Sequence, residues 1–212
     1  MENILKEFAA LNRIPRPSGH EENVAAYLEQ RGAAMGFEVI RDPYLNVIFE
    51  VPATPGRENA PTVILQAHMD MVCVGDSSYD PLTDAIETLI DGNAMKAKAT
   101  SLGADDGIGV ALILDLLASN TPHGPLRVIF TADEEQGMTG ASALDPKYLQ
   151  GAYLINLDWE DLRSLCIGCA GFLTMEYHKT APKTQAKGGA VAFTVQGLKG
   201  GHSGTEIGEN RG

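Results

Sequence analysis

The chain has 212 residues, 44% hydrophobic and 21% charged, with a formal net charge of −12. This length suits one core, or one domain and the start of a second, because domains usually have roughly 100–200 residues. The composition excludes a disordered or fibrous chain. Lysine and arginine do not cluster and the pI is near 4.7, so a basic surface for nucleic acid or anionic lipid is missing. We expect a globular protein without nucleic-acid or membrane partners.

The N-terminal residues 1–8 carry charges where a secretion signal needs an apolar run. No stretch of the sequence approaches the ~20 apolar residues of a membrane span. We therefore predict a cytoplasmic protein.

Three cysteines, an odd number, exclude a closed disulfide framework within this chain. Cys166 and Cys169 form a C-x-x-C pattern, which suits a redox pair or half of a zinc site. The second pair that such a zinc site needs is absent. We favour a structural interpretation, in which both are small residues packed in a strand and turn.

In the first third of the chain, the sequence predicts helices at residues 4–11 and 18–35 and strands at 39–40 and 46–51. Residues 52–61 are predicted to form a surface loop. Ser18 followed by Glu21 is a capping-box signature for the start of the second helix, and Gly36 marks its end.

The middle of the chain alternates buried strands with helices. Strands are expected at 62–67, 126–131 and 153–157, and helices at 105–117 and 140–144. A turn at Asp91-Gly92-Asn93 predicts a hairpin. This alternation predicts an α/β fold, with right-handed crossovers and a mostly parallel sheet that has helices on both faces.

A change of pattern after Gly171 predicts a second domain. Residues 172–178 and 190–195 alternate as antiparallel strands do, and Gly200-Gly201-His202-Ser203-Gly204 is rich in turn residues. We predict one domain over residues 1–186 and the beginning of a smaller α+β domain over residues 187–212.

Metal-ligating residue types follow the predicted strands. They are His68 and Asp70, the run Asp133-Glu134-Glu135, and Asp158. In such sheets ligands bind beyond the carboxyl ends of the strands. Residues i and i+2 of an extended segment face the same side, so Asp70 is placed to orient the imidazole of His68.

Two further carboxylates stand at the start of the predicted helix, in Gly103-Ala104-Asp105-Asp106-Gly107. Helix capping explains both, because Asp is a preferred cap. The flanking glycines also suit a tight backbone that aims one carboxylate into a site. Asp105 is our candidate ligand, and Asp106 our candidate cap or partner of a ligand.

Three consecutive acids at 133–135 are costly to bring together unless a cation neutralises them or solvent screens them. With metal present, one glutamate can ligate while its neighbour acts as general base. One histidine with several carboxylates suits zinc or manganese, and a bridging carboxylate suits two ions ~3.5–4 Å apart.

Five motifs in this order carry a family resemblance. They are H-M-D-M at 68–71, L-G-A-D-D-G-I-G at 102–109, D-E-E-Q-G at 133–137, N-L-D at 156–158 and G-L-K-G-G-H-S-G at 197–204. Together they resemble the co-catalytic zinc peptidase family, which includes carboxypeptidase G, aminoacylase, succinyl-diaminopimelate desuccinylase, peptidase T and the carnosinases. G-C-A-G at 168–171, G-M-T-G-A at 137–141 and the absence of a lysine after Asp106 are most similar to the bacterial aminoacyl-histidine (Xaa-His) dipeptidases.

The resemblance implies a zinc-exopeptidase-like catalytic domain over 1–186, with a lid and dimerisation domain beginning at 187. It also implies a role for each site residue. His68 holds one metal, Asp105 bridges both, Glu135 and Asp158 hold one each, and Glu134 is the general base. Asp70 orients His68.

Two further histidines belong to the resemblance. His202 corresponds to a lid histidine that approaches the substrate carbonyl oxygen, in some members from a partner subunit; a histidine in a turn is the structural alternative. The family also supplies a late histidine to the second metal, and these 212 residues contain no such residue.

The implied function is hydrolysis of Xaa-His dipeptides with two divalent ions, most often zinc, with manganese or cobalt as alternatives. A water held between the ions gives its proton to Glu134 and attacks the peptide carbonyl. The partners implied are a small peptide and a second subunit, through the lid. An N-acyl amino acid amidohydrolase, a tripeptidase and an inactive metal-binding fragment are the alternatives.

Overall fold

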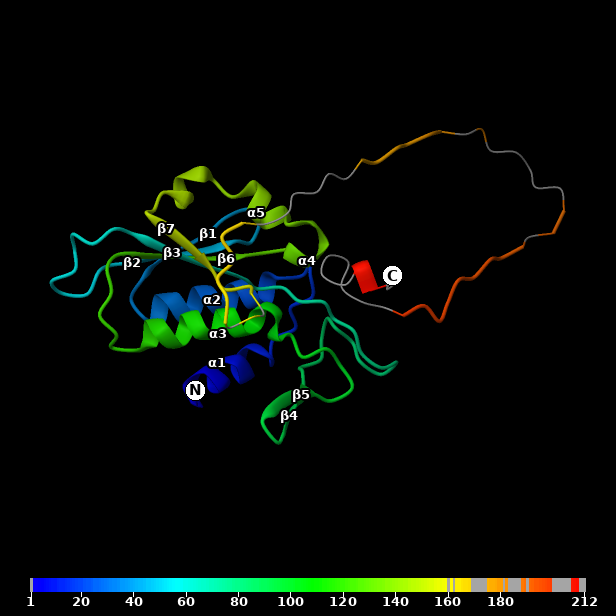
Figure 1. The fold of residues 1–212 in the computed structure, drawn as a ribbon, viewed down its shortest axis with the longest axis horizontal. Coiled ribbons are helices and arrows are strands. Elements are labelled where there is room, and N and C mark those ends of the chain that lie inside the picture. The colour runs from blue at the N-terminus through cyan, green and yellow to red at the C-terminus, as the bar shows by residue number, and fades with distance from the viewer. Residues whose placement is uncertain are drawn as a thin grey trace. The chain divides into compact units, whose positions relative to one another are not determined.

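The computed structural model describes residues 2–159, 161, 163–168, 175–180, 182, 188–189, 191–199 and 207–209 (Figure 1). The chain divides into two compact units, Met1–Ile167 and Gly168–Gly212. The predicted lid histidine, His202, and Cys169 lie outside the described residues.

The helices are α1 Glu2–Leu11, α2 Glu22–Ala34, α3 Ala104–Ala118, α4 Glu134–Gly137, α5 Thr139–Ala143, and the 3-10 helices η1 Pro146–Leu149 and η2 Ile207–Glu209. The three long helices stand where the sequence predicts them. The sequence pattern missed α4, because it is only four residues long and follows Asp133, which has a left-handed backbone with φ 55°.

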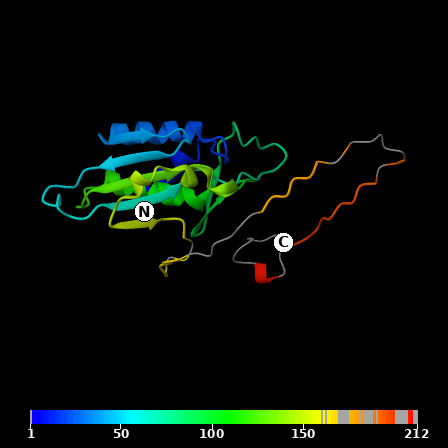
Figure 2. The same cartoon turned by 90° about the horizontal axis from the view of Figure 1, so that it is seen from above.

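Five strands form the main sheet: β1 Glu38–Arg41, β2 Val47–Val51, β3 Val63–His68, β6 Leu126–Thr131 and β7 Tyr153–Asn156. Their order is β1-β2-β6-β3-β7. Figure 2 shows these strands side by side, with β7 at one edge. A separate hairpin joins β4 Thr88–Asp91 to β5 Ala94–Ala97, as the turn at 91–93 predicts.

The α/β class is confirmed, but the sheet is mixed and not mostly parallel. β3 pairs in parallel with β6 and β7, whereas β2 pairs antiparallel with β1 and β6. The short connection between β1 and β2, residues 42–46, is the reason that these two strands are antiparallel, because a parallel neighbour needs a crossover of a dozen or more residues.

The main core lies between the sheet and the long helices. Leu28 of α2, Phe49 of β2, Val110 of α3 and Phe130 of β6 belong to this buried cluster. Figure 1 shows α1, α2 and α3 together on one side of the sheet. The other face carries a smaller cluster, in which Leu144 and Tyr148, from the end of α5 and from η1, pack on Ile48, Ile64 and Ile129. Helical structure therefore covers both faces unequally.

The strand register brings three carboxyl ends to one edge of the sheet. His68 pairs with Thr131, so β3 and β6 end together. Gln66 pairs with Asn156 at the end of β7, and Leu157 N–H then donates to Gln66 O at 2.9 Å. The residues that follow these strands must therefore emerge next to one another.

The described residues of the two segments predicted as antiparallel strands, 175–178 and 191–195, have no strand structure. The remaining residues of both segments lie outside the described part. Cys166 is exposed, so the packed position that we expected for it is not found.

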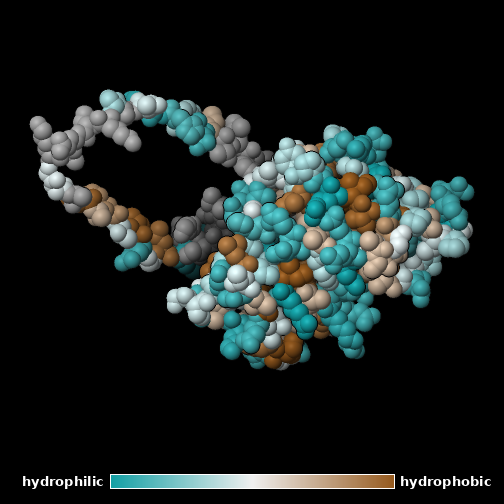
Figure 3. Space-filling view, turned by 180° about the vertical axis from the view of Figure 1, so that it is seen from behind, coloured by the Kyte–Doolittle hydropathy of each residue, from teal (hydrophilic) through white to brown (hydrophobic). Residues whose placement is uncertain are grey.

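On the face of the molecule seen in Figure 3, hydrophobic residues form separate patches among hydrophilic ones. Such scattered apolar side chains are normal on a globular protein. No helix among the described residues is long and apolar enough to cross a membrane.

Gly32 allows α2 to lie close to the sheet. A Cβ atom at this position would lie 2.7 Å from side-chain atoms of both Phe49 and Val39. We expect Gly32→Ala to destabilise the protein by about 1–3 kcal/mol through overpacking, which exceeds the ~1 kcal/mol that alanine gains in a helix. Urea unfolding followed by circular dichroism measures this, with Ala33→Gly, at an exposed position of α2, as a propensity control. A more stable Gly32→Ala protein would contradict the close packing.

Candidate metal centre

His68 stands at the centre of the candidate site, at the end of β3. Its Nε2 atom is 2.9 Å from Oδ1 of Asp105 and 3.9 Å from Oδ2 of Asp158. Each of these residues offers a ligand atom within 4.8 Å of the other two. The imidazole is buried, with 1% of its side chain exposed, whereas Asp105 is 62% exposed. The site is therefore open to solvent on the Asp105 side.

Glu134 and Glu135 of α4 approach the same imidazole. With His68 they form a second group whose ligand atoms all lie within 4.8 Å of one another. Four carboxylates from three different segments, at the starts of α3 and α4 and just after β7, thus converge on one histidine. This oxygen-rich set with one imidazole fits zinc or manganese.

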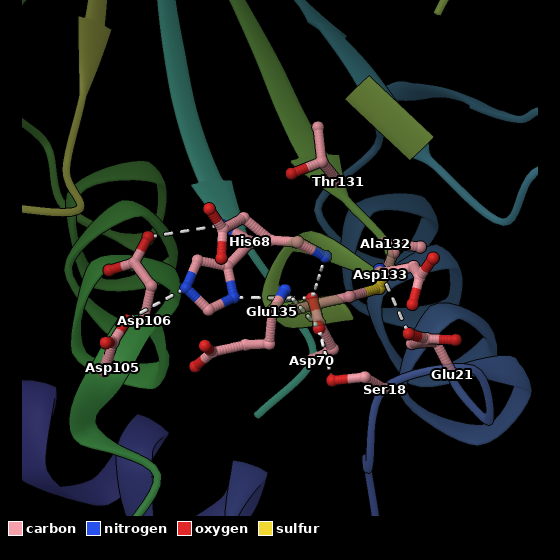
Figure 4. Close-up of polar contacts among 12 residues, drawn as sticks. Ser18, Glu21, His68, Asp70, Asp105, Asp106, Thr131, Ala132, Asp133 and Glu135 are labelled. Atoms are coloured by element: carbon pink, nitrogen blue, oxygen red, sulfur yellow. Dashed lines mark hydrogen bonds and ion pairs between the residues drawn. The ribbon is translucent and has the colours of Figure 1, made fainter. Parts of the chain in front are cut away.

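Asp70 connects His68 to α4 (Figure 4). Its Oδ1 atom is 3.4 Å from His68 Nδ1 and accepts the backbone N–H of Glu134 at 3.1 Å. Its Oδ2 atom accepts the N–H of Glu135 at 3.3 Å. One buried carboxylate therefore holds both the ring of His68 and the backbone of the two glutamates.

The capping box predicted that Ser18 would cap α2, but Ser18 does not do so. Its hydroxyl donates to Asp70 Oδ2 at 2.7 Å, and the cap position of α2 is Glu21, with no side-chain capping bond. The reason is the tertiary position of Asp70, whose charged oxygen accepts a stronger hydrogen bond than a neutral group would.

Glu21 is a site-supporting residue that we had interpreted only as a capping residue. It is buried, and its Oε1 atom accepts the N–H of Gly19 at 2.8 Å and that of Asp133 at 3.0 Å. It thereby fixes the residue that precedes Glu134. The S-G-x-E spacing marked this residue, but local pattern could not identify a partner 112 residues away.

The carboxylate of Asp106 accepts backbone hydrogen bonds and points away from that of Asp105 (Figure 4). Its Oδ1 atom accepts the N–H of Gly109, as a helix cap does, and its Oδ2 atom accepts the N–H of His68, both at 3.2 Å. Asp105 and Asp106 have non-helical backbone angles and are joined by a cis peptide bond. Burial raises the pKa of Asp106 to about 7.

The charge of the site is concentrated and negative. Burial alone would lower the pKa of His68, but the hydrogen bonds with Asp105 and Asp70 raise it to about 11. Burial raises the pKa of both Glu134 and Glu135, and nearby carboxylates raise both further. A positive charge among these acids is therefore strongly favoured, and a divalent cation would supply it.

The residues predicted as ligands, His68, Asp105, Glu135 and Asp158, thus lie together with the predicted base, Glu134. Asp70 lies within 3.4 Å of the imidazole that we expected it to orient. The predicted lid histidine belongs to the part of the chain that the structure does not describe.

Comparison with known proteins places this site within a peptidase family. The profile of Peptidase family M28 matches residues 46–163. The cytosol non-specific dipeptidase of Escherichia coli K12 is 44% identical over 205 residues, covering 94% of this chain and 42% of that protein. An aminoacylhistidine dipeptidase structure from Vibrio alginolyticus has a TM-score of 0.71 and 46% identity, covering 74% of this chain and 33% of that one.

The structure of aminopeptidase PepT from Bacillus cereus also matches, with a TM-score of 0.66 and 27% identity over 76% of this chain and 44% of that one. This chain therefore spans less than half of the length of each of these relatives. The profile match covers all four candidate ligands and Glu134.

Asn46 supports the loop that carries the acids, and its loss tests that support. Its buried amide donates to Gly140 O at 2.8 Å and accepts the N–H of Ala132 at 3.2 Å. We expect Asn46→Ala to destabilise the protein by about 1–3 kcal/mol, because buried backbone groups lose their partners. Chemical denaturation measures this. Asn156→Ala, which removes two exposed hydrogen bonds, one donated to Gln66 and one accepted from the N–H of Asp158, is the control with a smaller expected loss. Equal stability of both variants would contradict this role.

Proposed function

We propose that this chain, which belongs to Peptidase family M28, is the metal-binding part of a metallo-dipeptidase that hydrolyses Xaa-His dipeptides. The observation that carries the proposal is the convergence of four carboxylates on the buried imidazole of His68. The similarity to dipeptidases of Escherichia coli and Vibrio alginolyticus supports the substrate class. Because the chain spans less than half of these proteins, the activity is proposed for the whole protein.

The proposed cofactor is a pair of divalent ions, zinc in the first instance. His68 and Asp158 would hold one ion, Glu135 the other, and Asp105 both. Bound there, such ions acidify a water molecule and polarise a peptide carbonyl. The mixed nitrogen and oxygen donors support zinc, with manganese or cobalt as weaker candidates.

Glu134 is the proposed general base. Its backbone is fixed by Asp70, so its carboxylate starts from a defined position at the first turn of α4. It accepts a proton from the attacking water as the water oxygen bonds to the peptide carbonyl carbon. It then returns that proton to the leaving amine as the C–N bond breaks. Burial raises the pKa of Glu134. A carboxylate with a raised pKa is a stronger base and accepts the proton of the water more readily.

The remaining features of the proposal concern the whole protein. We place it in the cytoplasm, because the Escherichia coli relative is a cytosol dipeptidase. Residues 1–186 would belong to the catalytic domain and 187–212 to a lid. His202 would approach the substrate carbonyl oxygen, and the lid would mediate a homodimer.

Metal binding can be measured directly on the 212-residue chain. A ligand that binds only the folded state stabilises it by about 2.7 kcal/mol at 100 times its Kd. We expect zinc to raise Tm by several degrees, and EDTA to reverse this. His68→Ala should abolish the shift, whereas Asp145→Asn, an exposed acid at η1, should retain it. An equal zinc shift in His68→Ala would contradict the proposed centre.

The role of Glu134 predicts a separation of metal binding from turnover. We expect Glu134→Gln in the full-length protein to retain its zinc-induced Tm shift and to lose at least ~100-fold in kcat, because glutamine cannot accept the proton. Hydrolysis of carnosine measures this, with exposed Glu87→Gln as the control variant. Turnover of wild-type rate in Glu134→Gln would refute the role.

The substrate class requires its own assay. Dipeptides ending in histidine, other dipeptides, tripeptides and N-acetyl amino acids should be compared by kcat/KM. We expect the Xaa-His dipeptides to give the highest value. A preference for tripeptides or N-acetyl amino acids would replace the proposed substrate while leaving the metal centre intact.

A further inference from the structure

We propose that Arg16 is a positioning residue for the metal centre. Its guanidinium group joins the end of β3 to the loop before Asp105, and so sets the separation of His68 and Asp105. This inference rests on the proposed function, because it assigns Arg16 a role through the ligands of that site.

The contacts of Arg16 reach both sides of the site. Its Nη1 atom donates to Met69 O and to Asp70 O, each at 3.1 Å. Its Nη2 atom donates to Gly103 O at 2.6 Å. The acceptors stand one and two residues after His68, and two residues before Asp105. A single rigid fork therefore spans the two segments that carry these ligands.

The backbone of Arg16 is attached to the same segment as its side chain. Its carbonyl oxygen accepts the N–H of Met71 at 3.1 Å, and Pro17 forms a parallel bridge with Met71. Pro15 and Pro17 flank the residue and restrict the backbone on either side of it. The backbone of Arg16 is thus fixed to the segment after β3, and this limits the positions that its guanidinium group can take.

The guanidinium cation of Arg16 is buried and therefore needs hydrogen-bond partners within the protein. Arg16 is 1% exposed and is among the largest fully buried side chains. A buried cation is costly unless it is hydrogen-bonded, and here three carbonyl oxygens accept from it. Burial lowers the pKa of Arg16 to about 10, so the group stays charged at neutral pH.

Two glycines make room for the guanidinium. A Cβ atom at Gly103 would lie 2.5 Å from Nη2 of Arg16, and a Cβ atom at Gly107 would lie 2.6 Å from it. These glycines stand on either side of Asp105 and Asp106. The backbone that presents Asp105 is therefore shaped around the cation, and the sequence G-A-D-D-G reflects that close approach.

Arg127 offers a matched comparison within the same chain. It also bonds carbonyl oxygens, those of Tyr148 at 3.2 Å and Gln150 at 3.1 Å, and it pairs with Glu50. Arg127 pairs with Ile64 near the start of β3, whereas His68 ends that strand. Arg127 is only partly buried, with 17% of its side chain exposed, so it controls for the loss of an arginine that bonds carbonyl oxygens. A loss confined to Arg16 variants would thus reflect the position of Arg16 beside the site.

The test compares Co²⁺ binding by the 212-residue chain with that of Arg16→Met, Arg16→Lys and Arg127→Met. Isothermal titration gives the Kd, and the visible absorption of bound Co²⁺ reports its ligand geometry. Each variant is measured at a temperature at which circular dichroism shows it folded. Partners that orient metal ligands typically contribute 10–100-fold in affinity.

We expect at least ~10-fold weaker Co²⁺ binding and an altered absorption spectrum in Arg16→Met. Arg16→Lys should be impaired as well, because one ammonium group cannot reproduce the fork over three carbonyls. Arg127→Met should bind Co²⁺ as the wild type does. If Arg16→Met does not fold, Arg16→Lys and Gly107→Ala, whose methyl group would displace the guanidinium, decide the question.

Wild-type Kd and spectrum in the folded Arg16 variants would overturn the inference and leave the proposed metal centre standing. Equal weakening by Arg127→Met would also overturn it, since the effect would then be a general one. A wild-type chain that binds no Co²⁺ would instead overturn the proposed function itself, and the inference with it.

Discussion

The buried carboxylate of Asp70 is the constraint on which the candidate site depends. It accepts hydrogen bonds from Ser18 in the N-terminal loop and from the backbone of Glu134 and Glu135, and it lies beside the ring of His68. These partners come from three segments that are far apart in the sequence. Because an unpaired buried carboxylate is costly, the folded chain must bring all of them together to satisfy it. The same interaction therefore stabilises the fold and sets the geometry of the site.

The arrangement of the sheet explains why the acids meet at this place. The parallel pairing of β3 with β6 and β7 brings the ends of three strands to one edge. Each following loop contributes carboxylates, and like charges at this density raise one another's pKa values. The folded chain therefore holds carboxylates that repel one another, and a divalent cation bound among them would reduce this repulsion. This coupling of a local cost to a ligand is typical of functional sites.

Much of the fold could be predicted from hydrophobic periodicity. The long helices and the buried strands β3 and β6 have strong patterns, because one face or both must be apolar to pack in the core. The antiparallel pairing of β2 with β6 could not be predicted, because a strand's own sequence carries little information about its neighbour. The four-residue helix α4 also escaped, since it is shorter than any periodic signal and begins after the left-handed Asp133.

By itself the sequence determined the chemical types and the order of the candidate site residues: His68, Asp70, Asp105, Glu134, Glu135 and Asp158. Their positions after apolar runs indicated a shared edge, because strand ends can be located from local pattern. Only the tertiary structure decided which groups touch. Ser18 reaches Asp70, Glu21 reaches Asp133, and Arg16 reaches Gly103. These contacts join residues 52 to 112 positions apart, so no local spacing encodes them and only packing selects each donor's acceptor.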